Sequence, residues 1–258
     1  IRYQLGDLLR ERIYAMALGY SAQDDLDRLA HDPAFRIAVW NRSGDNVVNE
    51  RLASQPTQSR LLSMMANHNT NINGLRNGLF QSVFRHLATS DCDQRVRHAT
   101  IDLDSFPIEV HGKQQGSNYN GHYRTKAYHP LVASFSVAGD YDSTRVGKRM
   151  GNGFIHAILR QGSVHTSKGA TRFIGNIIEQ ARQLAYVTDF RMDAGYTVGS
   201  VMDALTEKNM RFVGRLKTNA KLDELAAPYL VRPVGRPPLK GYEFCVELGM
   251  HQADSWKH

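Results

Sequence analysis

Apolar residues recur at helical spacing through the first hundred residues. The clearest stripe begins near the start of the chain and comprises Leu5, Leu8, Leu9, Ile13, Ala17 and Leu18. A short helix is expected to follow, capped at Ser21 and closed by Pro33. We then expect a polar loop over 41–56 and helices over 57–65 and about 72–87. The pattern therefore predicts an all-helical N-terminal region over residues 1–98.

The periodicity changes from three or four residues to two near residue 99. Ile101 and Leu103 fall on one face of a strand, and Asp102 and Asp104 fall on the other. A polar loop is expected over 111–127. Further strands are expected over 128–138, 144–150, 186–192 and around 212–216, with helices capped by Ser167 and over about 198–208. Three strands followed by alternating helices and strands predict an α/β core over residues 99–217, with a mixed five-stranded sheet flanked by helices.

Composition narrows the class of protein. The chain has 258 residues, of which 41% are hydrophobic, so it can bury a core. The formal net charge of +7 favours a polyanionic partner such as DNA. No apolar run reaches the roughly 18 residues of a membrane span, and the two cysteines are expected to be reduced thiols in a cytoplasmic protein. The chain begins at Ile1 inside an expected helix, so we expect it to be a fragment.

Acidic residues on the apolar strands are the first candidate site. Asp102 and Asp104 share one face, and Asp193 follows the strand expected over 186–192. If these two strands are neighbours, the carboxylates converge and suit Mg²⁺ or Mn²⁺, and a pair of such ions can activate attack on a phosphodiester. Caps are the alternative, because Asp104 could cap a turn with Ser105 and Asp193 could cap the next helix.

Basic side chains lie near this candidate site in the sequence. Lys113 falls in the loop after the first strand, and Arg215 and Lys217 follow the last one. Each could contact DNA phosphates, although ordinary solvent exposure is an alternative for all three.

Several segments, in this order, resemble bacterial insertion-sequence transposases of the Asp-Asp-Glu type. The segments are Arg12-Ile-Tyr-Ala-Met-Ala-Leu-Gly-Tyr, Leu52-Ala-Ser-Gln-Pro-Thr-Gln-Ser-Arg-Leu, Thr100-Ile-Asp-Leu-Asp-Ser-Phe, His111-Gly-Lys-Gln-Gln-Gly, Tyr128-His-Pro-Leu, Leu159-Arg-Gln-Gly-Ser-Val-His and Arg191-Met-Asp-Ala-Gly-Tyr. No single segment is decisive, but their joint order is fairly specific to that family.

The resemblance implies a ribonuclease H-like fold and metal-dependent DNA cleavage and strand transfer at the ends of an insertion sequence. It implies that Asp104, which precedes a small hydroxyl residue, and Asp193 are the first two catalytic acids and bind Mg²⁺ or Mn²⁺ at a two-metal site. Asp102 stays open as the alternative to Asp104. The expected partners are terminal inverted repeats, target DNA and a second copy of the chain, with a nucleoid location in a bacterial cytoplasm.

The third acid of that family is a Glu on a later helix, and this sequence departs from the pattern. Glu243 and Glu247 lie in a strand-like stretch and match poorly. We expect the Glu to lie beyond His258 or to have been lost, residues 218–258 to begin a β-rich insertion, and this chain alone to be inactive. The alternatives are a remnant that only binds DNA and a metal-dependent nuclease of the same fold.

Overall fold

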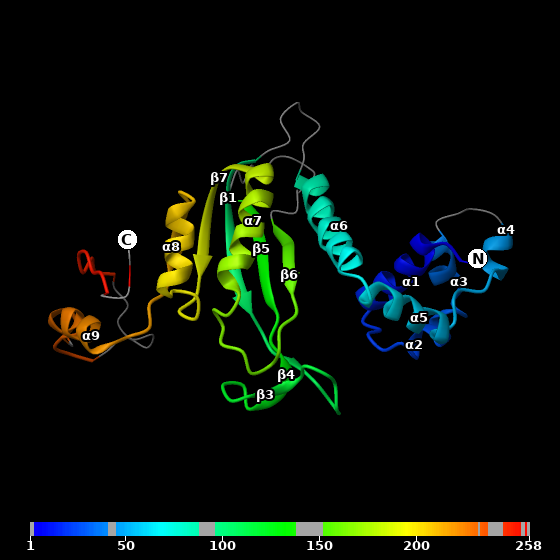
Figure 1. Ribbon diagram of the computed structural model, residues 1–258, viewed down its shortest axis with the longest axis horizontal. Coiled ribbons are helices and arrows are strands. Elements are labelled where there is room, and N and C mark those ends of the chain that lie inside the picture. Colours follow the sequence, from blue (N-terminus) through cyan, green and yellow to red (C-terminus); the bar gives the residue numbers. More distant parts are fainter. Residues whose placement is uncertain are drawn as a thin grey trace. The chain divides into compact units, whose positions relative to one another are not determined.

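The computed structural model describes residues 3–40, 45–87, 96–137, 152–231, 233–236, 245–253 and 256. It forms two compact units, Ile1–Leu75 and Arg76–His258, and each is described by itself (Figure 1). The helices are α1 (Leu5–Ala17), α2 (Asp25–Leu29), α3 (Pro33–Trp40), α4 (Asp45–Asn49), α5 (Gln55–Ala66), α6 (Asn69–Leu87), α7 (Ala170–Leu184), α8 (Gly199–Glu207), α9 (Ala220–Ala226) and the 3-10 turn η1 (Ala227–Tyr229). The strands are β1 (Val96–Ser105), β2 (Ile108–Glu109), β3 (Asn118–Asn120), β4 (Thr125–Tyr128), β5 (Leu131–Val137), β6 (Asn152–Ile158), β7 (Ala185–Met192) and β8 (Arg211–Gly214).

The first unit is built from helices, as the sequence predicts. Its core contains Leu26, Phe35, Val39, Trp40 and Leu52, all nearly inaccessible to solvent. Three predictions were wrong in detail, the first because α2 has Asp24 and not Ser21 as its N-cap. Pro33 is the first residue of α3 and does not merely close the preceding helix. Proline is tolerated at this position because its missing N–H would have no partner in the first turn of a helix. The predicted loop over 41–56 contains α4 and the start of α5, while residues 41–44 lie outside the described residues.

A buried carboxylate joins α1 to α5 in this unit. The side chain of Glu11 is almost fully buried, and Gln58 Nε2 donates a hydrogen bond of 2.8 Å to Glu11 Oε2. Among the described residues, Glu11 Oε1 and Gln58 Oε1 are buried without a hydrogen-bond partner. Burial raises the pKa of Glu11 to about 7, and the hydrogen bond from Gln58 offsets only part of the rise.

Glu11→Gln is expected to stabilise the first unit at pH 8 by up to about 3 kcal/mol. The free energy of unfolding falls as the pH rises through the folded pKa of about 7, because the buried Glu11 side chain must then carry a charge. Glutamine stays neutral at every pH and adds an N–H donor. Urea unfolding, followed through Trp40 fluorescence in a Trp256→Phe background, would measure the free energy of unfolding at pH 5 and pH 8. The exposed Asp24→Asn is the control, and an unchanged pH slope in Glu11→Gln would contradict the prediction.

The second unit contains a mixed five-stranded sheet in the order β6-β5-β1-β7-β8. The β6–β5 and β5–β1 pairs are antiparallel, and the β1–β7 and β7–β8 pairs are parallel. This order and these directions are those of the ribonuclease H-like fold, so the predicted fold class is confirmed. Because β1 lies at the centre and runs parallel to β7, their carboxyl ends meet at the same edge of the sheet.

One face of this sheet forms the core of the unit. Ile101 and Leu103 from β1 and Phe190 from β7 pack with the apolar stripe of α7, which lies along the sheet (Figure 1). The buried stripe of α7 comprises Ala170, Phe173, Ile174, Ile177, Ile178, Ala181 and Leu184. The helix begins later than predicted, since its N-cap is Gly169, at a φ of +79°, and not Ser167. The opposite face carries the alternate, largely polar side chains of the same strands.

The strands before α7 differ from the prediction. The strand expected over 128–138 is divided between β4 and β5, and β6 was missed. The loop predicted over 111–127 contains β3 and most of β4, which pair with β2 in the order β2-β4-β3. We call these three strands the small sheet; it lies beyond the carboxyl end of β1 (Figure 1). The strand predicted over 144–150 lies outside the described residues.

The later elements follow the sequence pattern more closely. Strands β7 and β8 and helix α8 lie where alternation and helical spacing predict them. Beyond β8, the described residues of 215–231, 233–236 and 245–253 form α9 and η1 and no strand. A β-rich insertion beginning at 218 therefore stays a prediction. Among the described helices, none combines the length and the apolar character that crossing a bilayer requires.

Candidate active site

Two aspartates lie at the carboxyl ends of the neighbouring parallel strands β1 and β7. The last register pair of these parallel strands is Leu103 with Met192, so Asp104 and Asp193 each follow directly after a member of that pair. Both aspartates are exposed. The strand adjacency on which the predicted convergence depends is therefore present in the fold, and the convergence of the carboxylates stays a prediction.

Each of these carboxylates is fixed through one oxygen. The backbone N–H of Ser105 donates to Asp104 Oδ1 at 2.7 Å, and that of Gly195 donates to Asp193 Oδ1 at 2.9 Å. Within the described ranges, no hydrogen bond or ion pair involves Oδ2 of either side chain. The alternative that both aspartates are caps is supported for Asp104 only by its hydrogen bond from the Ser105 N–H. Asp193 does not cap α8, because the N-cap of that helix is Val198.

Asp102 differs from Asp104 although it lies on the same face of β1. Both of its carboxylate oxygens are bound by Arg191, which faces it across the β1–β7 pair. Nη2 of Arg191 donates to Asp102 Oδ2 at 2.9 Å, and Nε donates to Oδ1. The hydrogen bonds that Arg191 donates to Asp102 raise the pKa of Arg191 above its usual value. Asp102 is thus engaged by a protein cation, and Asp104 is not.

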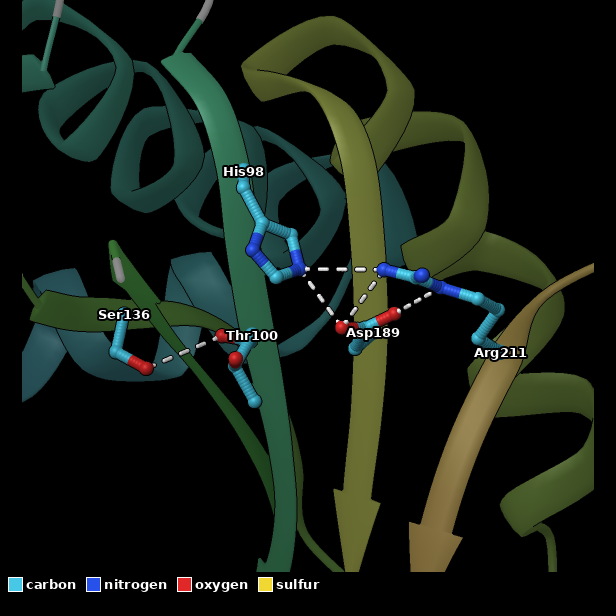
Figure 2. Close-up of polar contacts among 5 residues, drawn as sticks. All are labelled: His98, Thr100, Ser136, Asp189 and Arg211. Atoms are coloured by element: carbon cyan, nitrogen blue, oxygen red, sulfur yellow. Dashed lines mark hydrogen bonds and ion pairs between the residues drawn. The ribbon is translucent and has the colours of Figure 1, made fainter. Parts of the chain in front are cut away.

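A second charged cluster lies nearer the amino ends of the same strands. Figure 2 shows His98 on β1, Asp189 on β7 and Arg211 on β8 pointing toward one another. His98 Nε2 lies 2.7 Å from Asp189 Oδ2, and Arg211 donates to both oxygens at 2.7 and 3.0 Å. Partial burial opposes the charge of Asp189, but hydrogen bonds from His98 and Arg211 outweigh it and hold its pKa below the usual value. The cluster therefore neutralises this part of the sheet.

These ion pairs were not predicted from the sequence. Polar residues at every second position of β1 and β7 were the available signal, since His98, Thr100 and Asp102 alternate with apolar residues, as do Asp189 and Arg191. The pairing itself depends on the register of two strands about ninety residues apart in the chain. Alternation alone could not supply that register.

The three basic residues predicted to bind DNA are all exposed, but they occupy different places. Arg215 follows β8, and its backbone N–H donates to the carbonyl of Met192 at 3.2 Å, which places it at the same sheet edge as Asp193. Lys217 lies two residues further on. Lys113 lies between β2 and β3 of the small sheet.

The two carboxylates fit two of the oxygen ligands of a divalent cation, because each leaves an oxygen available at an exposed strand end. Among the described residues, no group of three His, Cys, Asp or Glu side chains could hold a metal ion. Glu247 lies in described backbone without helix or strand, which contradicts the strand-like expectation there, and Glu243 lies outside the described residues. The described residues thus provide a pair of ligands.

Comparisons with known proteins identify a family for the chain. The model of a family described as "Transposase DDE domain group 1" matches residues 1–258. Similar solved structures include a piggyBac transposase synaptic complex with hairpin DNA, at 13% identity and a TM-score of 0.41, covering 88% of this chain and 45% of that chain. Another is the Mos1 strand transfer complex, at 14% identity and a TM-score of 0.26, covering 87% of this chain and 61% of that chain. The chain thus spans less than two thirds of either. A search of curated proteins found no match.

Proposed function

The chain belongs to the transposase DDE domain family, group 1, and we propose that it carries out metal-dependent cleavage and strand transfer of DNA at the ends of an insertion sequence. One observation carries the proposal. Asp104 and Asp193 are exposed at neighbouring positions on the carboxyl ends of two adjacent parallel strands. A basic chain with a net charge of +7 complements the DNA substrate.

We propose Asp104 and Asp193, and not Asp102, as the metal-binding catalytic acids. Arg191 already binds both oxygens of Asp102, whereas backbone N–H groups hold only one oxygen of each proposed acid. These local hydrogen bonds orient the carboxylates while leaving Oδ2 available. Bound Mg²⁺ or Mn²⁺, as a pair in the proposed site, supplies the positive charge that activates an attacking hydroxyl and stabilises the leaving oxygen.

A further acid, DNA-binding residues and a second copy of the chain complete the proposed function. We propose that a third acid, a Glu, completes the acidic set, and that the pair of aspartates is not sufficient for cleavage. Lys113, Arg215 and Lys217 would bind phosphates of the terminal repeats and target DNA, with two copies acting together in the bacterial nucleoid. In this view 1–98 is the helical region, 99–217 the catalytic core and 218–258 the start of an insertion.

A cleavage assay tests the proposal. The chain, and the chain extended by the coding sequence that follows it, are incubated with Mn²⁺ and a duplex ending in the element's terminal repeat. Nicking at the repeat end by the extended form supports the proposal. Cleavage of any branched DNA without preference for the repeat would favour a nuclease, and binding without cleavage by both forms would favour a DNA-binding remnant.

Removing the two basic residues beside the acids is expected to weaken DNA binding. Each phosphate contact that is lost should reduce the slope of log affinity against log salt by about one. Arg215→Ala combined with Lys217→Ala should therefore lower the slope by about two, measured by fluorescence anisotropy on a duplex at several salt concentrations.

The matched control removes two charges at the other end of the sheet. Arg182 ends α7 and Lys208 follows α8, and both precede the amino ends of the next strands. Arg182→Ala combined with Lys208→Ala should change the slope less. Equal changes in the two double variants would show that net charge alone, and not the predicted contact surface, determines binding.

A further inference from the structure

Arg160 occupies an unusual position between β6 and α7. Its Nε donates to the carbonyl of His129 at 2.9 Å, and its Nη1 donates to the carbonyls of Thr166 and Lys168 at 2.7 and 2.8 Å. Burial lowers the pKa of this half-buried guanidinium, and no acidic side chain among the described residues forms an ion pair with it. Arg160 therefore holds together the start of β5 and the approach to α7 through backbone carbonyls.

The Arg160 guanidinium lies within interaction range of the Tyr196 hydroxyl. Tyr196 is fully buried, and its hydroxyl lies close enough to Arg160 and Ser105 to be influenced by both. Neither Arg160 Nη2 nor Tyr196 OH makes a hydrogen bond of normal geometry to any described residue, but the hydroxyl interacts with Arg160 and with Ser105 at longer range. Buried polar atoms without partners are costly, and phenylalanine would fill the same space without that cost. Packing alone therefore does not explain why a hydroxyl and a guanidinium are buried here.

Tyr196 also connects this pair to both acids. Burial raises the pKa of Tyr196 to about 12, and Asp104 and Asp193 contribute less to the rise. The backbone N–H of Tyr196 donates to the carbonyl of Asp193 at 3.1 Å. The ring is therefore anchored in the same turn that carries one acid and lies beside the strand end that carries the other.

A second contact joins the segment of Arg160 to this turn. A Cβ atom added to Gly195 would lie 2.7 Å from Cγ2 of Thr166 and 3.1 Å from Oδ1 of Asp193. The backbone beside Asp193 thus rests directly on Thr166, whose carbonyl Arg160 holds at 2.7 Å. Two separate contacts, one through Thr166 and one through Tyr196, link Arg160 to the turn of Asp193.

We propose that Arg160 and Tyr196 are positioning residues, which hold Asp104 and Asp193 at the spacing that a divalent cation requires. The inference rests on the proposed metal-dependent function of the two acids. Arg160 acts through the Thr166 carbonyl and the Tyr196 hydroxyl, and neither residue needs to touch the cation. Residues of this kind behind metal ligands typically change affinity about 10- to 100-fold when they are altered.

Mn²⁺ binding by the chain, measured by calorimetry together with thermal unfolding, tests this role without requiring DNA cleavage. Tyr196→Phe removes only a buried hydroxyl, so the melting temperature should stay within a few degrees while Mn²⁺ affinity falls about tenfold. Arg160→Lys keeps the charge, but its single ammonium cannot reach three carbonyls, and it should weaken Mn²⁺ binding at least as much. Tyr186→Phe, at an exposed site near the start of β7, is the control and should bind Mn²⁺ like the wild type.

Different outcomes test the positioning role and the proposed metal site separately. Wild-type Mn²⁺ affinity in both Tyr196→Phe and Arg160→Lys would overturn the positioning role while leaving the metal site intact. The positioning role would also be overturned if the loss of Mn²⁺ affinity accompanied a lower melting temperature and disappeared on cooling. The two residues would then only stabilise the fold. If Asp104→Asn combined with Asp193→Asn binds Mn²⁺ like the wild type, the proposed metal site itself fails.

Discussion

Asp104→Asn and Asp193→Asn are each expected to reduce DNA strand cleavage by about a hundred- to a thousandfold, the range for losing one preorganised electrostatic partner of a reacting group. Asparagine keeps the size of the side chain and an oxygen that can accept the backbone hydrogen bond from Ser105 or Gly195. It removes the negative charge that a divalent cation requires. The rate of nicking in the terminal-repeat assay, in whichever form of the protein cleaves, measures the effect.

Asp102→Asn is the matched control for this prediction. Asp102 lies on the same face of β1, two residues before Asp104, so the substitution changes the charge of the protein equally. Its carboxylate is bound through both oxygens by Arg191 and is not expected to hold a cation. Asp102→Asn should therefore cleave within a fewfold of the wild type. The reverse ranking, with Asp102→Asn inactive and Asp104→Asn active, would reverse the assignment of the first acid.

The β1 segment shows how far sequence reasoning reaches at this site. Alternation predicted the strand and placed Asp102 and Asp104 on one face, and the strand end predicted Asp193. Alternation could not choose between the first two, because the choice depends on Arg191 lying opposite Asp102 in the register. That register is a property of the folded sheet, and it is set by the packing of the other face.

The segment around Arg160 shows a second limit. The segments that begin at Leu159 and Arg191 each carry part of the family resemblance, but nothing in their spacing indicates that they touch. Thr166 and Gly195 meet only because α7 returns the chain across the sheet, as the apolar stripe of the helix requires. The functional residues that the sequence analysis missed, Arg160 and Tyr196, owe their importance to that contact.

The small sheet was missed for a different reason. Its segment is polar and rich in glycine, and its strands are only two to four residues long, so periodicity has too few positions to detect them. Long-range contacts hold it instead. Asn120 Nδ2 donates to the carbonyl of Gly162 at 2.7 Å, and a Cβ atom at Gly162 would lie 1.9 Å from the carbonyl oxygen of Ala127.

The largest expected effect on stability is at Phe190, in the middle of β7. Its side chain is fully buried, and it pairs in register with Ile101 of β1 on one side and Phe212 of β8 on the other. Phe190→Ala should lower the free energy of unfolding by about 3–5 kcal/mol, because both the transfer of the ring and the cavity that remains oppose folding. For a unit of this size the melting temperature should fall by roughly 10 °C, measured by calorimetry.

Val187→Ala is the matched control on the same strand. Val187 lies on the polar face with 42% of its surface exposed. Val187→Ala should therefore lower the free energy of unfolding by no more than about 0.5–1 kcal/mol. Because Phe190 fixes the position of the strand that ends at Asp193, Phe190→Ala should also weaken Mn²⁺ binding at temperatures near its lowered transition. Equal effects of the two substitutions on unfolding would show that the core does not lie on the α7 face of the sheet, and the register that brings Asp104 beside Asp193 would lose its physical basis.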